Sequence, residues 1–74
     1  MPITKAHDRY MKVLLERIAA DDYPSGELMD RVEILLDRDH VDDYLAILFR
    51  KVESSHYPSK QLLDRIARWT LAAS

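Results

Sequence analysis

Two stretches of this chain align without a gap: YMKVLLERIAADDYPSGELMDR at residues 10–31 and YLAILFRKVESSHYPSKQLLDR at residues 44–65. The second follows the first at a constant offset of 34 positions. Identical residues at this offset are Asp8/Asp42, Tyr10/Tyr44, Leu14/Leu48, Tyr23/Tyr57, Pro24/Pro58, Ser25/Ser59, Leu28/Leu62, Asp30/Asp64 and Arg31/Arg65. The match predicts an internal repeat, in which two hairpins of one design follow each other and stack.

Apolar residues recur every three or four positions, which is the spacing of one face of a helix. This spacing predicts helices over residues 5–20, 26–37, 40–55 and 60–72, with Tyr10, Leu14 and Ile18 as the core stripe of the first. A single glycine argues against a turn-rich β fold. We therefore expect one all-α domain over residues 1–74. In it, repeat 1 (about 5–37) and repeat 2 (about 39–72) form tandem helical hairpins packed as a compact four-helix bundle.

The Tyr-Pro-Ser turns, Tyr23-Pro24-Ser25 and Tyr57-Pro58-Ser59, separate the two helices of each predicted hairpin. Proline disfavours the α conformation for the tyrosine before it, so the preceding helix ends there. Each serine then stands where an N-cap is needed. We expect these six residues to be structural, with the tyrosine rings lying as lids over the hairpin ends. Paired recognition by the two tyrosines is the functional alternative.

The junction between the repeats is acidic and reads Asp37-Arg38-Asp39-His40-Val41-Asp42-Asp43. Asp39 is the predicted N-cap of the third helix, and Asp42 and Asp43 favour the positive end of its dipole. The spacing is not that of a calcium loop, and the three histidines form no zinc-binding pattern, so we predict no metal site. An acidic surface for a basic protein partner is the functional interpretation.

The Asp-Arg pairs of the repeat, Asp30-Arg31 and Asp64-Arg65, are predicted to be structural. We expect Arg31 to meet Asp8 between helices, and Arg65 to meet Asp42 in the same way. Such ion pairs would set the register of the hairpins.

Composition excludes several classes of function. The chain has no cysteine and no glycine-rich phosphate loop, and no serine stands in a recognisable nucleophile pattern, so we predict neither an enzyme nor a cofactor. No apolar run reaches the roughly 18 residues of a membrane span, and the N-terminus lacks the apolar stretch of a signal peptide, which predicts a cytoplasmic protein. A net charge of −2 with interleaved signs argues against a dedicated nucleic-acid binder.

Two surfaces remain for a partner besides the acidic junction. The last predicted helix carries Lys60, Arg65 and Arg68 with Trp69, which makes a small regulatory nucleic-acid binder the alternative function. The first and third helices each carry a second apolar stripe, as at Met11 and Leu15. That stripe faces the other hairpin or, failing that, a second copy of the chain in a homodimer.

The doubled pattern of Tyr-x3-Leu, Tyr-Pro-Ser and Asp-Arg resembles small duplicated-helical-hairpin proteins encoded by high-GC Gram-positive bacteria and their phages. The resemblance covers about Tyr10 to Trp69, implies a cytoplasmic setting, and transfers no activity. The leading prediction is a non-enzymatic protein-interaction module. Its predicted partner-binding residues are Asp37, Asp39, His40, Asp42, Asp43, Lys60, Arg68 and Trp69.

Overall fold

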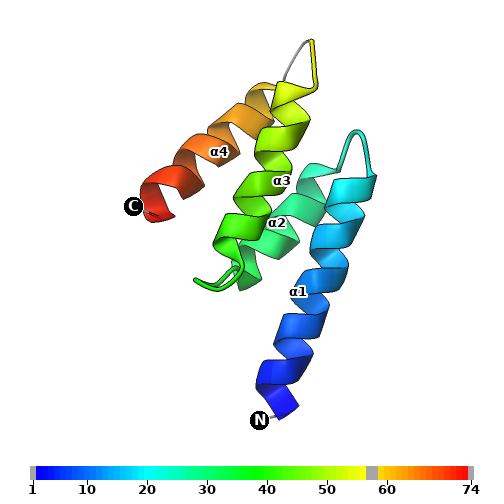
Figure 1. The fold of residues 1–74 in the computed structure, drawn as a ribbon, viewed down its shortest axis with the longest axis vertical. Helices are drawn as coiled ribbons and strands as arrows, with labels where there is room; N and C mark the ends of the chain where they lie inside the picture. The colour runs from blue at the N-terminus through cyan, green and yellow to red at the C-terminus, as the bar shows by residue number, and fades with distance from the viewer. Residues whose placement is uncertain (1, 57–58, 74) are drawn as a thin grey trace. The chain divides into compact units, whose positions relative to one another are not determined.

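The described part of the chain forms four helices, as the apolar spacing predicts (Figure 1). A computed structural model describes residues 2–56 and 59–73, and the side chains of 5–56 and 59–72. The helices are α1 (Pro2–Ala20), α2 (Gly26–Leu35), α3 (Val41–Glu53) and α4 (Lys60–Ala73). No strand occurs within these described ranges, so the all-α prediction is confirmed.

The helices belong to two compact units, Met1–Leu36 and Asp37–Ser74. In each unit the chain turns back on itself, so that α1 packs against α2 in the first and α3 packs against α4 in the second (Figure 1). The predicted tandem hairpins are therefore present. The helices matched by the sequence differ in length, with 19 and 10 residues in the first unit and 13 and 14 in the second. The repeat as a structural unit stays a prediction.

Serine side chains cap the second helix of each hairpin. The hydroxyl of Ser25 accepts a hydrogen bond from the backbone N–H of Leu28 at 3.1 Å. The hydroxyl of Ser59 accepts one from the N–H of Leu62 at 3.3 Å. Each bond satisfies one of the N–H groups that a helix leaves without a partner at its start. Both predicted caps are confirmed, while Tyr57 and Pro58 lie outside the described residues.

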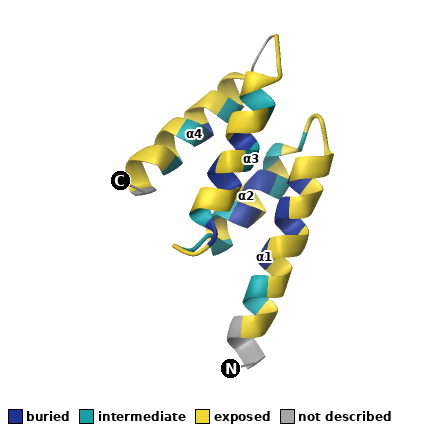
Figure 2. Cartoon of the chain, viewed as in Figure 1, coloured by how far each residue is buried: buried dark blue, intermediate teal, exposed yellow. Residues whose placement is uncertain are grey.

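The buried residues follow one face of α1, α2 and α3 (Figure 2). In the first unit these are Met11, Leu14, Leu15 and Ile18 from α1, with Met29 and Val32 from α2. In the second unit they include Tyr44, Leu45 and Leu48 from α3. The predicted stripe of α1 is partly wrong, because Tyr10 is 42% exposed while Met11 and Leu15 are buried. The inward face of α1 is therefore turned by about one residue from the predicted one.

No helix within the described ranges is long and apolar enough to span a bilayer. Each helix carries charged residues along its length, as does α2 with Glu27, Asp30, Arg31 and Glu33.

Replacing Ser25 or Ser59 by alanine should lower the free energy of unfolding by about 1 kcal/mol, because each change removes the acceptor at a helix start. Urea denaturation followed by circular dichroism measures this loss. Ser25→Asp retains an acceptor at the same place and should stay near wild type. Equal losses from Ser25→Ala and Ser25→Asp would contradict the capping role.

Candidate functional site

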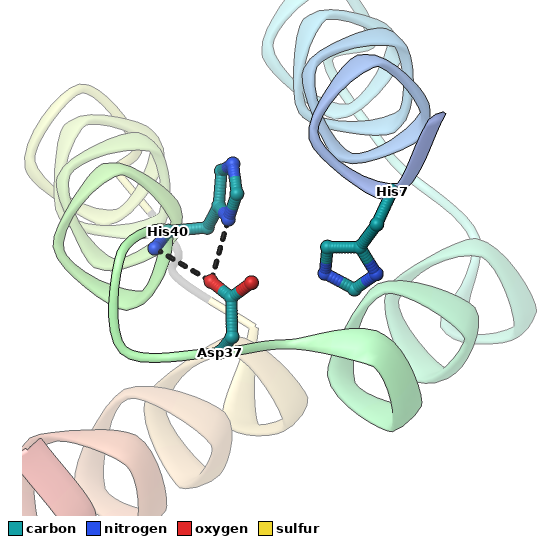
Figure 3. A group of neighbouring side chains, drawn as sticks. All are labelled: His7, Asp37 and His40. Atoms are coloured by element: carbon teal, nitrogen blue, oxygen red, sulfur yellow. Dashed lines mark hydrogen bonds and ion pairs between the residues drawn. The ribbon is translucent and has the colours of Figure 1, made fainter. Parts of the chain in front are cut away.

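The start of α3 is held by the carboxylate of Asp37. Its Oδ1 accepts a hydrogen bond from the backbone N–H of His40 at 3.0 Å and lies 2.5 Å from His40 Nδ1 (Figure 3). The carbonyl oxygen of Asp37 also accepts from the N–H of Val41 at 3.0 Å. These bonds hold the turn that precedes α3. The N-cap residue of the helix is His40, which has no side-chain cap bond, so the prediction of Asp39 as the N-cap is wrong.

This pairing draws the imidazole of His40 into the protein. His40 is buried, and the residue precedes α3 without a side-chain cap bond of its own. The prediction that His40 contacts a partner has no support in this geometry and stays a prediction, because the ring is held against Asp37 and buried. Asp37 is half-buried by the same interaction. His7, which Figure 3 also labels, belongs to α1 of the other unit.

Three carboxylates of the acidic junction stay on the surface, those of Asp39, Asp42 and Asp43. Asp42 and Asp43 stand in the first turn of α3, and Arg50 and Lys51 stand in its last turn. Both placements favour the helix dipole, as the sequence predicts for the two aspartates. An acidic surface for a basic partner is thus reduced to these three residues.

The basic residues of α4 do not form one exposed strip. Lys60 and Arg68 are exposed, but Arg65 between them is 6% exposed. Trp69 is half-buried, and its indole Nε1 is buried without a hydrogen-bond partner in the described part of the chain. The polar edge of the indole therefore points into the protein. Two separated cations give a weak electrostatic anchor for a phosphate backbone.

The turn between α1 and α2 presents an aromatic ring to solvent. Tyr23 is 91% exposed, so the prediction that its ring forms a lid is wrong. The backbone N–H of Tyr23 donates to Asp21 Oδ1 at 3.0 Å, which holds the turn without using the ring. The ring lies at an open hollow of about 790 Å³, lined by Arg17, Ala20, Asp21, Asp22, Tyr23, Ser25 and Leu28.

A second hollow, of about 470 Å³, lies on the first unit and is called the α2 groove below. It is lined by Tyr10 from α1 and by Glu27, Asp30, Arg31, Ile34 and Leu35 from α2. Glu27, Asp30, Arg31 and Ile34 are spaced by three, four and seven positions, so they share one face of α2. Ile34 is 81% exposed on that face, opposite the buried Met29 and Val32.

Sequence reasoning missed the α2 groove. The available signal was Ile34, an isoleucine among the polar positions Asp30, Arg31 and Glu33 and off the apolar stripe of its helix. The sequence predicts Tyr10 in the core because Tyr10, Leu14 and Ile18 follow one another at four-residue intervals, as residues on one helix face do. The spacing is satisfied just as well when the inward face is turned toward Met11.

Two of the groove residues have counterparts that are covered in the second unit. Tyr44 is fully buried and Arg65 is nearly so, whereas Tyr10 and Arg31 are exposed. Leu35 and its counterpart Trp69 are both half-buried, and Arg68, the counterpart of Ile34, is exposed. A tyrosine and an arginine in matching sequence positions are thus buried in one unit and open in the other.

The predicted ion pair between Asp8 and Arg31 is not formed. Asp8 Oδ2 lies 3.1 Å from Nζ of Lys12, one turn further along α1. Within the described ranges the side chain of Arg31 takes part in no hydrogen bond or ion pair. Lys12 is the better placed partner for Asp8, because an ion pair within one helix does not depend on how a second helix is placed. The guanidinium of Arg31 is left at the rim of the α2 groove.

Replacing Asp37 by alanine should cost about 1–2 kcal/mol of unfolding free energy, because it removes the acceptor for the N–H of His40 in the turn before α3 and the partner of the His40 ring. Asp37→Asn retains an acceptor for the N–H of His40 and should cost less. Asp39→Ala, at an exposed position, should change stability by no more than about 0.5 kcal/mol. Thermal or urea unfolding measures all three variants, and a loss in Asp39→Ala as large as in Asp37→Ala would contradict the assignment.

Comparisons with protein-family models, with curated proteins and with solved structures give no match to this chain. A function therefore has to be argued from the chain's own surfaces. Of those described above, the α2 groove combines exposed apolar side chains with an ionic rim. The α2 groove is the candidate functional site.

Proposed function

We propose that this chain is a non-enzymatic protein-interaction module that binds its partner at the α2 groove. The observation that carries the proposal is the exposure of Ile34 and Tyr10 at one hollow, whereas Tyr44, the counterpart of Tyr10, is buried in the second unit. Large apolar side chains gathered at a hollow mark an interaction surface more often than they mark ordinary surface. A cytoplasmic setting belongs to the same proposal and is supported by the sequence resemblance.

The composition of the α2 groove suits a protein surface. Protein interfaces combine an apolar centre with a polar rim, and aromatic residues and arginine are enriched there. Tyr10, Ile34 and Leu35 supply the apolar part, and Glu27, Asp30 and Arg31 supply the ionic rim. α2 has 10 residues and is thus about 15 Å long, enough to lie along two to three turns of a partner helix.

The exposed carboxylates Asp39, Asp42 and Asp43 supply a second element of the proposal. Charge of one sign at a surface speeds the encounter with a partner of opposite charge more than it strengthens the final complex. We therefore assign them to steering. The alternative function, a nucleic-acid binder using α4, has less support because Arg65 is buried and leaves Lys60 and Arg68 apart.

Ile34→Asp should weaken partner binding at least about tenfold, because a charge at the centre of an apolar contact has no compensating partner. Leu71→Asp is the matched control: Leu71 on α4 is 78% exposed, close to the 81% of Ile34, and lies outside the groove. The tagged wild-type chain and both variants are used for affinity purification, followed by titration of any protein recovered in stoichiometric amount.

Loss of that protein with Ile34→Asp but not with Leu71→Asp is the expected result. Equal binding by all three chains would contradict the groove as the binding surface. Retention on generic duplex DNA that falls steeply as salt rises would instead support the nucleic-acid alternative.

A further inference from the structure

The ionic residues of the α2 groove have an order that is complementary to itself. α2 runs from Gly26 to Leu35, so its midpoint falls between Asp30 and Arg31. A two-fold axis brings the same surface of two molecules together. If one residue faces a second residue of the other copy, that second residue faces the first in return. Two α2 helices that cross antiparallel at their midpoints therefore place Asp30 of each copy opposite Arg31 of the other.

Arg31 is available for such a contact. Its side chain is exposed and takes part in no ion pair within the described ranges, as noted above. A guanidinium facing a carboxylate forms charge-assisted hydrogen bonds, and two such pairs related by symmetry fix the orientation of both helices. Asp30 can serve as acceptor even where it has a contact within its own chain, because a carboxylate has two oxygens.

We propose that the α2 groove binds the α2 groove of a second copy of this chain, which gives a two-fold dimer. This inference rests on the proposed function and names its partner. The same crossing places Ile34 of each copy against the aliphatic stem of Glu27 of the other, and Tyr10 beside them. Apolar contact thus flanks the two ion pairs on both sides of the axis.

In the second unit the counterparts of Arg31 and Tyr10, which are Arg65 and Tyr44, are both buried in the folded chain. An arginine and a tyrosine at matching sequence positions are therefore accommodated away from solvent there. Covering Arg31 with a second copy would give the first unit the burial that its counterpart residues already have.

A substitution of Glu27 distinguishes between two possible occupants of the α2 groove, a second copy of this chain and a basic partner. Each groove carries two carboxylates and one guanidinium, so two grooves brought together repel through their excess negative charge. Glu27→Gln removes this repulsion and should tighten a dimer. The same change should weaken binding of a basic segment, which would use Glu27 as an acceptor.

Sedimentation equilibrium of the purified full chain, from micromolar to millimolar concentration, tests the dimer directly. We expect a monomer–dimer equilibrium that Ile34→Asp weakens at least about tenfold and Leu71→Asp leaves unchanged. Asp30→Arg alone and Arg31→Asp alone place like charges opposite each other and should each weaken it. The double variant Asp30→Arg/Arg31→Asp restores opposite charges and should restore the dimer, with circular dichroism melting used to verify that every variant is folded.

A wild-type chain that stays monomeric over the whole range would overturn the proposal. So would a dimer that survives Ile34→Asp, or a double charge exchange that dissociates as fully as either single change. If the chain is monomeric and Ile34→Asp still abolishes binding of another protein, the proposed function stands and the identity of the partner is wrong. If the chain is monomeric and Ile34→Asp leaves binding of every protein unchanged, the proposed function and the proposed dimer are both wrong.

Discussion

α2 has ten residues and therefore about three turns. One face of this helix points inward, with Met29 and Val32 fully buried. The opposite face, with Glu27, Asp30, Arg31 and Ile34, is then directed outward by the helical period alone. The Ser25 cap fixes where the helix begins. The α2 groove follows from these two constraints, because α1 brings Tyr10 to the side of that outward face.

The helices, their tandem hairpin arrangement and both serine caps could be predicted from the sequence. Each depends on neighbours within a few positions: a stripe at three and four residues, a proline that ends a helix, and a hydroxyl three residues before an N–H. Such signals are local, so one sequence contains them. The predicted helix bounds differ from the observed ones mainly at the start of α1, at Pro2, and at the ends of α2 and α3, at Leu35 and Glu53.

The predictions that are wrong concern features that depend on how far a neighbouring element covers a residue. Tyr10 and Tyr44 have equivalent sequence surroundings, yet one is half-exposed and the other is fully buried. Asp39 is a plausible cap by composition, but His40 is the N-cap residue of α3, and the carboxylate of Asp37 holds the turn before it. His40 reads as a surface residue among acids, but its pairing with Asp37 holds it inside. Periodicity states which residues share a face, not what covers that face.

The most direct test of the α2 groove as an interaction surface is a series of amide nuclear magnetic resonance spectra of the wild-type chain at increasing concentration. We expect amide resonances to shift increasingly with concentration at Tyr10 and along Glu27–Leu35, while those of α4 around Leu71 stay unchanged. Spectra that do not change with concentration, or changes confined to α4, would contradict it.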